Sequence, residues 1–309
     1  MTRHYILTRF NLGLYKRNKY LRSVRNEAWL EHRFELFEKY CLPSVVAQDS
    51  QSFVWLVLFD QDTPEAYKGR VRGYMRAYPF FRPLSVRGEY AAHFVQIYQQ
   101  AIQKDLQRLK AAGIPVDRVI TTCLDNDDAL SSDFVSRVEH LYRPLPDASF
   151  ITFLRGLQYF TELNIATRIK YPQNHFLSFV ETPTEDLWVR TVHAYGDHSH
   201  LYQYQGVHIH EVDTPEEPAW VEVVHTTNIA NDVLMHRGTE LEADRAVLQK
   251  HFCIDQQLSD RGYTIYCTSF RMRQAREVFR KAFFKALCCL PASVFSNQFA
   301  PKREALPRE

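Results

Sequence analysis

The stretch that decides the fold is Val119-Ile120-Thr121-Thr122-Cys123-Leu124-Asp125-Asn126-Asp127-Asp128-Ala129-Leu130. Its apolar first half is typical of a strand buried on both faces of a parallel sheet, and the acids follow where that strand would leave the core. In open α/β sheets the carboxyl ends of the strands form the ligand site. Three neighbouring carboxylates repel one another unless a cation lies between them. Asp125, Asp127 and Asp128 therefore predict a site for a divalent metal ion.

Two other interpretations of this acidic turn can be compared with the metal site. A calcium loop of the EF-hand type requires Gly at its sixth position and Glu at its twelfth. Counting from Asp125, those positions hold Leu130 and Ser136, so this interpretation is excluded. A solvated turn that merely caps the helix predicted from Phe134 stays open, because Asp-x-Asp sequences are common.

The first half of the chain alternates predicted strands and helices. Apolar residues at helical spacing over residues 30–41 leave Arg33 on the outer side, and Pro43 is expected to end this helix. A continuously apolar run at residues 53–59 predicts a second buried strand, and a long helix follows from Phe94. The alternation predicts right-handed crossovers and an α/β fold with a Rossmann-type, mostly parallel sheet and helices on both faces.

The character of the sequence changes beyond Pro146. Strand-like segments with few helical signals between them follow at residues 150–154, 165–171, 176–180 and 188–194. We expect one domain over residues 1–265, in which 1–145 form a nucleotide-binding half and 146–265 a smaller antiparallel half. A basic amphipathic helix and tail are expected at 266–309. Its segment 270–290 either packs on the domain or lies on an anionic membrane surface.

Several segments together resemble a known family. Leu124 to Leu130 resembles the Asp-x-Asp-Asp segment of glycosyltransferases with the GT-A fold, and in particular of the putative rhamnosyltransferase family of bacteria. Other segments resemble that family in the same order: Thr8-Arg9-Phe10-Asn11, Trp29-Leu30 with Arg33, Leu36-Phe37-Glu38, Cys41-Leu42-Pro43-Ser44 with Gln48, and Phe53-Val54-Trp55-Leu56. The resemblance covers most of the chain. It implies a GT-A-like fold, a nucleotide-sugar donor, and Mn²⁺ or Mg²⁺ bridging the donor diphosphate to the acids.

Five residues gain expected roles around the donor. By resemblance, the turn with Arg9 and Asn11 approaches the nucleotide, and Arg9 either bonds the base or diphosphate or forms a structural salt bridge. Asp60 follows a predicted strand, and either binds the ribose or base or caps the next helix. Asp125 is expected to contact the donor as well as the metal ion. The family resemblance further implies a metal-binding histidine from the C-terminal part, which here is His225.

The transfer also needs a carboxylate that deprotonates the acceptor hydroxyl. Glu181 and Asp197 lie just past two of the predicted strands, so each is a candidate for this catalytic base. Each is equally open to being a surface acid, which is the usual situation of such residues.

Histidines gather between residues 193 and 210, at His193, His198, His200, His208 and His210. Two His-x-His pairs would project both rings to one face of a strand and could bind zinc. They predict, as an alternative function, a zinc-dependent hydrolase. No His-Glu-x-x-His helix accompanies them, which favours solvated or packed side chains instead.

Composition limits the class of protein further. The net charge of +2 over 309 residues gives no field that would favour nucleic acid. The six cysteines lack Cys-x-x-Cys spacing, so free thiols are expected. No apolar stretch resembles a signal peptide or a membrane span. The expectation is a cytoplasmic protein, peripheral at the inner face of the membrane if residues 270–290 bind lipid.

These observations predict a metal-dependent glycosyltransferase that moves a sugar to a hydroxyl of a bacterial glycan or glycolipid. The family resemblance leans toward a deoxysugar such as rhamnose and toward inversion at the anomeric carbon. The alternatives are the zinc-dependent hydrolase and a non-catalytic carbohydrate-binding module.

Overall fold

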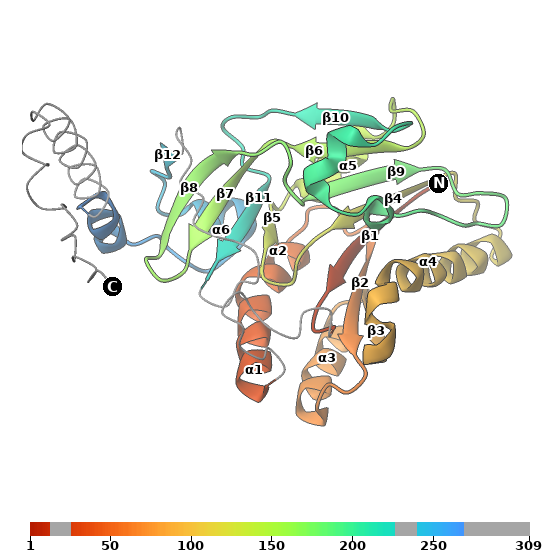
Figure 1. The fold of residues 1–309 in the computed structure, drawn as a ribbon, viewed down its shortest axis with the longest axis horizontal. Helices are drawn as coiled ribbons and strands as arrows, with labels where there is room; N and C mark the ends of the chain where they lie inside the picture. Colours follow the sequence, from red (N-terminus) through yellow and green to blue (C-terminus); the bar gives the residue numbers. More distant parts are fainter. Residues whose placement is uncertain (13–25, 226–239, 269–309) are drawn as a thin grey trace, which may run out of the picture. The chain divides into compact units, whose positions relative to one another are not determined.

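A seven-stranded sheet in the order β10-β6-β9-β4-β1-β2-β3 forms the centre of the protein (Figure 1). The computed structural model describes residues 1–12, 26–225 and 240–268. The strands of this central sheet are β1 (Thr2–Arg9), β2 (Phe53–Asp60), β3 (Phe81–Val86), β4 (Arg118–Cys123), β6 (Ser149–Phe153), β9 (Leu177–Glu181) and β10 (His208–Val212). β3, β2, β1 and β4 are mutually parallel, while β9 is antiparallel to both of its neighbours. The predicted α/β fold with a mostly parallel sheet is confirmed.

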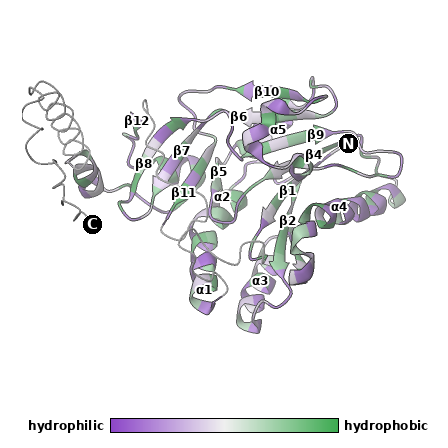
Figure 2. Ribbon diagram, viewed as in Figure 1, coloured by the Kyte–Doolittle hydropathy of each residue, from purple (hydrophilic) through white to green (hydrophobic). Residues whose placement is uncertain are grey.

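Helices cover both faces of the central sheet, as predicted. The α-helices labelled in Figure 1 are α1 (Glu27–Leu36), α2 (Leu42–Val46), α3 (Glu65–Ala77), α4 (Phe94–Ala111), α5 (Phe134–Leu141) and α6 (Val247–Phe252). Successive side chains along a strand point to opposite faces. On one face Trp55 of β2 packs with Phe34 of α1 and Tyr67 of α3. On the other face Leu56 packs with Tyr98 of α4. β2 is buried on both faces and is apolar along nearly its whole length (Figure 2).

Local sequence explains where these helices begin and continue. Asn26 caps α1, because its side-chain oxygen accepts the Trp29 N–H at 2.6 Å. α4 buries a residue at every fourth position, namely Tyr98, Ile102 and Leu106. The sequence predicted that Pro43 ends the first helical segment, but in the structure the helical chain continues past this residue. The chain passes through a π-helical turn (η1, Phe37–Cys41) into α2, and Pro43 occupies the first turn of α2, where its missing N–H matters least.

A second sheet, in the order β12-β8-β7-β11-β5, begins directly after the acidic turn. Its strands are β5 (Ala129–Leu130), β7 (Arg155–Phe160), β8 (Ile165–Lys170), β11 (Trp220–Val224) and β12 (Glu240–Leu241). β11 is parallel to β7, and the other neighbours are antiparallel. The Trp220 indole lies against Gly156, where a Cβ atom would approach Trp220 Cδ2 to 2.1 Å. Only glycine fits at this position of β7.

The second half of the chain contributes to both sheets. Two of its predicted strands become β6 and β9 of the central sheet, and another becomes β8 of the second sheet. The segment 188–194, predicted as a strand, contains instead the start of a 3₁₀ helix, η3 (Val192–Tyr195), and a second such helix, η4 (His198–Gln203), follows. Thr191, with φ 71°, precedes η3 in a backbone conformation that a strand cannot contain.

Contacts divide the chain after Ser259. The unit of residues 1–259 holds both sheets, and the second unit begins at Asp260. Its residues 260–268 are helical, whereas the basic segment predicted at 270–290 lies outside the described residues. In the described ranges, none of the helices combines the length and the apolar character needed to cross a membrane.

A buried histidine on β1 makes stability depend on pH. His4 is 1% exposed, and its Nε2 lies 2.8 Å from Thr122 Oγ1 on β4. Burial lowers the pKa of His4 from 6.5 to about 3. Between these values the unfolded state binds a proton that the native state does not. We therefore expect the free energy of unfolding to fall as the pH drops below about 6.5, by up to about 1.4 kcal/mol per pH unit from this residue.

Chemical denaturation between pH 7 and pH 5 measures this effect. His4→Gln keeps a hydrogen-bonding side chain beside Thr122 and does not titrate, so its pH dependence is expected to be shallower than that of the wild type. Equal slopes would assign the effect to other groups, such as His193, whose pKa burial also lowers to about 3.

Candidate active site

The candidate site lies where the order of the strands reverses. After β1 the chain adds β2 and β3 on one side, and then returns to place β4 on the other side of β1. At such a switch point, the crevice outside the carboxyl ends of the strands is where ligands bind. Arg9 ends β1 and Asp125 follows β4, and Arg9 Nη2 lies 4.0 Å from Asp125 Oδ1. The structure thus brings these two predicted residues together at the switch point.

Asn126 fixes the acidic turn to the end of β1. Its side-chain amide donates to the carbonyl oxygens of Arg9 (3.0 Å) and Phe10 (2.5 Å). Its Oδ1 accepts a hydrogen bond from Arg33 Nη1 at 3.2 Å. Because Asn126 is buried, these bonds form away from competing water and hold the backbone that carries Asp125.

Asp127 is buried between an arginine and a histidine. Its Oδ2 accepts hydrogen bonds from Arg33 Nη1 of α1 and from His225 Nε2, the latter at 2.9 Å. Burial alone would raise the pKa of Asp127, but the Arg33 guanidinium and His225 lower it well below its usual value. The predicted ligands Asp127 and His225 therefore meet as expected, but the cation beside Asp127 is the guanidinium of Arg33.

Asp128 is held by different partners. Its Oδ1 accepts the backbone N–H of Val223 on β11 at 2.8 Å, and its Oδ2 lies 2.8 Å from His175 Nε2. Burial raises the pKa of Asp128 to about 7, and the charge of Asp127 adds to this while the His175 bond opposes it. Burial would lower the pKa of His175, but the bond to Asp128 raises it to about 9. The hydrogen bond between Asp128 and His175 thus raises the pKa of His175 and opposes the effect of burial on the pKa of Asp128.

Three side chains could hold a divalent ion together. Asp125, Asp128 and His175 each offer a ligand atom, and these atoms all lie within 4.8 Å of one another. Ligand atoms about 2.1 Å from a Mg²⁺ ion lie within about 4.2 Å of one another, so small side-chain adjustments suffice. The two carboxylates suit Mn²⁺ or Mg²⁺ in charge and chemistry, and the imidazole offers a third ligand atom. This set shares Asp125 and Asp128 with the predicted ligands and adds His175.

The other residues predicted to bind the nucleotide hold the neighbouring turn. Asn11 Oδ1 accepts the Asp60 N–H at 2.8 Å, and Asn11 Nδ2 donates to Thr63 Oγ1 at 2.9 Å. Asp60 Oδ1 accepts the Asp62 N–H at 3.0 Å. Both residues lie at the carboxyl edge, as predicted, but these bonds tie the ends of β1 and β2 to the start of α3.

Sequence reasoning missed two members of the site. Arg33 was predicted to face outward because the helical spacing of apolar residues assigned the inner face to its neighbours, but its side chain is only 8% exposed and pairs with Asp127. His175 precedes β9 in a turn without periodic pattern. Arg33 belongs to one of the segments that resemble the family, and this resemblance was a signal that Arg33 has a role in the site. Nothing comparable distinguished His175.

The structure places Glu181 away from this site, contrary to its predicted role as catalytic base. Glu181 pairs with Val119, at the amino end of β4, whereas the acids follow the carboxyl end. The reason is that β9 runs antiparallel to β4. Glu181 instead accepts the backbone N–H groups of Arg190 and Thr191, each at 2.8 Å. Asp197 caps η4 by accepting the Ser199 N–H, and its side chain is 61% exposed.

The histidine-rich region does not form a metal site of its own in the structure. His193 is half-buried, with its ring 5.6 Å from that of Tyr98 and 5.3 Å from that of Phe94. His208 and His210 lie on β10 at the edge of the central sheet. Within residues 193–210, all of which are described, no side chain belongs to a three-residue ligand group. The zinc-dependent hydrolase based on these histidines stays a prediction. The ring of His198 lies 5.7 Å from that of His175.

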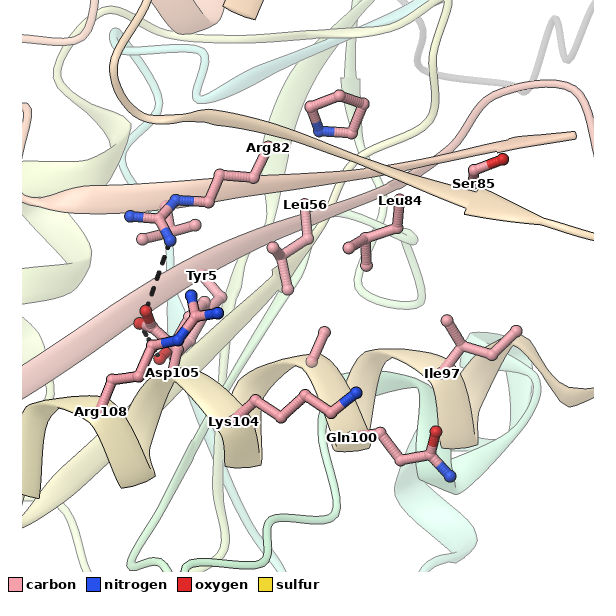
Figure 3. A pocket seen from close by; sticks show the side chains of 13 residues that line it. Tyr5, Leu56, Arg82, Leu84, Ser85, Ile97, Gln100, Lys104, Asp105 and Arg108 are labelled. Carbon is pink, nitrogen blue, oxygen red and sulfur yellow. Dashed lines mark hydrogen bonds and ion pairs between the residues drawn. The ribbon is translucent and has the colours of Figure 1, made fainter. Parts of the chain in front are cut away.

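A pocket of about 350 Å³ lies between β3 and α4, away from the acidic turn (Figure 3). Arg82, Lys104 and Arg108 line it around Asp105, above an apolar floor. Asp105 accepts a hydrogen bond from Tyr5 at 2.9 Å and pairs with Arg82 at 3.5 Å. No residue of the acidic turn lines this pocket, so the clustered acids mark a different place on the molecule.

Comparison with solved structures gives distant likenesses. S. aureus TarS 1–349 has 8% identity and a TM-score of 0.39 over 72% of this chain and 60% of that chain. Its complex with UDP has 9% identity and a TM-score of 0.37 over the same shares. Mouse xyloside xylosyltransferase 1, in its apo form, has 12% identity and a TM-score of 0.26 over 49% of this chain and 52% of that chain. This chain therefore covers three fifths of the TarS chain. Likenesses with TM-scores this low support no inference about fold or function.

Comparison by sequence is more decisive. No curated protein matches the chain. The family described as "Putative rhamnosyl transferase" matches residues 14–237, well over half of the sequence. The chain therefore belongs to this family of glycosyltransferases.

Proposed function

We propose that this protein transfers a sugar from a nucleoside diphosphate donor to an acceptor hydroxyl, with a divalent cation held by Asp125, Asp128 and His175. The observation that carries the proposal is the cluster itself, in which three ligand atoms lie within 4.8 Å of one another at the switch point of the sheet. Membership of a glycosyltransferase family supports the reaction class. The carboxylates suit Mg²⁺ and Mn²⁺ alike.

Arg9 is the residue best placed to bind the donor diphosphate. Its guanidinium lies over the Phe94 ring, 4.8 Å from the centroid, and beside Asp125 at 4.0 Å. The planar guanidinium offers paired N–H donors that match phosphate oxygens. Asn126 holds the carbonyl of Arg9 and so fixes the distance between this cation and the acidic turn. When bound, Mn²⁺ or Mg²⁺ would neutralise the charge that the departing diphosphate gains.

Asp127 and His225 have a supporting role in this proposal. Arg33 already supplies the positive charge that Asp127 requires, and the pair is buried. Asp127 then anchors α1 and the residue after β11 to the acidic turn, which keeps the neighbouring ligands in place. The alternative is that Asp127 and His225 bind the ion themselves after Arg33 moves aside. The two arrangements differ in which variants lose metal-dependent binding.

The family assignment supports a deoxysugar such as rhamnose as the transferred group. Transfer with inversion and a glycan or glycolipid acceptor are further parts of the proposal. A carboxylate must then take the acceptor's proton on the side of the sugar opposite the diphosphate. Contact with an anionic membrane through residues 270–290 stays a prediction, because that segment lies outside the described residues.

Release of the nucleoside diphosphate tests the proposed function. Purified protein is incubated with UDP-, GDP- and dTDP-sugars and with CMP-sialic acid, with water in place of the acceptor, and the freed nucleotide is quantified by chromatography. We expect slow release from one class of nucleoside diphosphate sugar when Mn²⁺ or Mg²⁺ is present. Release should stop with a chelator and resume when the metal is restored. Absence of release from every donor, together with absence of nucleotide binding, would refute sugar transfer.

A further inference from the structure

A row of buried polar side chains crosses the second sheet and leads to the acidic turn. Thr167 of β8 is opposite Gln158 of β7, and Gln158 is opposite Glu222 of β11. Residues directly opposite one another on neighbouring strands point to the same face. All three are almost fully buried, at 1%, 0% and 7% exposure respectively. We call these three residues the polar row.

Glu222 is the end of the polar row next to the candidate metal ligands. β11 pairs with β5 through Val221 and Ala129, and the next residue along β11 is Glu222. The Val223 N–H then donates to Asp128, the residue before Ala129. Because neighbouring strands lie about 4.8 Å apart, Glu222 is one strand away from Asp128.

The side chain of Glu222 faces the turn that carries His175. Alternation along β11 places Trp220 and Glu222 on one face. The Trp220 ring stacks on Phe176, with 4.8 Å between centroids, and Phe176 follows His175 directly. The negative charge of Glu222 accordingly reaches His175, although its effect on the pKa of that residue is smaller than those of burial and Asp128.

The polar row has hydrogen-bonding capacity that the described residues do not use. Gln158 Nε2 donates to Glu222 Oε2 at 2.7 Å, but Gln158 Oε1 and Thr167 Oγ1 are buried without a partner among the described residues. An unpaired buried polar group costs about 1–3 kcal/mol. Native proteins contain few such groups, and those that persist call for an explanation such as a functional role. Two of them beside a buried carboxylate suit a ligand that presents several hydroxyl groups.

We propose that Glu222 is the catalytic base of the transfer and that Gln158 and Thr167 bind hydroxyl groups of the acceptor. This inference rests on the proposed function. The acceptor oxygen forms a bond to the anomeric carbon of the donor sugar while the bond from that carbon to the diphosphate oxygen breaks. The diphosphate leaves with the bonding electrons. The hydroxyl proton passes to Glu222 Oε1, an atom that accepts no hydrogen bond from the described residues, while Gln158 holds Oε2.

Glu222 meets the requirements for a base better than the two acids singled out from the sequence. Glu181 lies at the amino end of the neighbouring strand β4, and both of its oxygens accept backbone N–H groups. Asp197 is largely exposed and caps its own helix. Glu222 combines burial, a positioning hydrogen bond and a place beside the candidate metal ligands.

The test compares Glu222→Gln with the wild type in two measurements. The first is the shift in melting temperature caused by the nucleoside diphosphate with Mn²⁺, which reports donor binding. The second is the rate of nucleoside diphosphate release from the best donor of the panel described above, with water as acceptor. We expect Glu222→Gln to keep the shift and to lose release by at least about 100-fold, because a positioned base contributes roughly that much or more. Glu222→Asp should retain part of the rate.

Three outcomes decide the matter. Glu240→Gln, the same change at an exposed site on β12 of the same sheet, controls for substitution and should release nucleotide at the wild-type rate. Release of the nucleoside diphosphate by Glu222→Gln at the wild-type rate would overturn the inference. It would also be overturned if Asp197→Asn loses release while Glu222→Gln keeps it. If the wild type shows neither a metal-dependent shift nor release, the proposed function itself fails, which is a different result from a failure of Glu222 alone.

Discussion

One nucleoside diphosphate is expected to raise the melting temperature of the wild-type protein by several degrees in the presence of Mn²⁺ or Mg²⁺, and by much less with a chelator. The ligand binds the native state alone, so at about a hundred times its dissociation constant it adds roughly 2.7 kcal/mol to the free energy of unfolding. A domain of this size shifts by roughly 2–4 °C for each kcal/mol. Thermal denaturation with UDP, GDP, dTDP and CMP measures this shift in melting temperature and identifies the nucleobase of the donor.

Single substitutions locate the ion within the acidic turn. Asp125→Asn and His175→Gln should abolish the metal-dependent part of the shift, because each removes a member of the cluster. Asp62→Asn changes an exposed acid at the same edge of the sheet and should leave the shift intact. Asp127→Asn separates the two arrangements of ligands. A shift lost in Asp127→Asn and His225→Gln but kept in Asp125→Asn and His175→Gln would assign the ion to Asp127 and His225 instead.

The fold could be predicted from the sequence because its main signals are local. The run at residues 53–59 is apolar without interruption, which is typical of a strand buried on both faces, and the structure contains it as β2. A parallel sheet places the residues that follow each strand at its carboxyl edge, so the acids after β4 were expected there. Arg9 and Asp125 then met because parallel strands expose the same ends on one edge.

The parts that could not be predicted depend on long-range pairing. Glu181 lies at the end of the sheet opposite to the acids because β9 is antiparallel to β4. The direction of a buried strand cannot be predicted from its residues, since buried strands of either direction are apolar. Arg33 was assigned to the outer face because helical periodicity counts a charged residue as exposed, whereas its partner Asp127 is 94 residues away. Glu222 escaped notice because it is a single acid in the alternating strand β11, where its buried neighbours were unknown.

Arg33→Met is expected to lower the free energy of unfolding by about 3–5 kcal/mol. Methionine replaces the packing of the side chain but leaves Asp127 as a buried carboxylate with one fewer partner, and breaking a buried ion pair from one side is costly for that reason. Arg72→Met is the matched control. It breaks an Arg72–Glu65 pair of 2.6 Å whose side chains are 53% and 73% exposed, and exposed pairs contribute about 1 kcal/mol or less. Urea denaturation at neutral pH measures both variants.

The double variant Arg33→Met with Asp127→Asn shows whether the cost comes from the uncompensated charge. Removing both charged groups of a buried pair is often neutral or stabilising, so the double variant should be more stable than Arg33→Met alone. The amide introduced by Asp127→Asn could still bond to His225, which is the other partner of this position. If Arg33→Met costs no more than Arg72→Met, then Arg33 does not neutralise Asp127 in solution. Asp127 would then be available to a metal ion, and the assignment of the ion to the Asp125, Asp128 and His175 cluster would have to be revised.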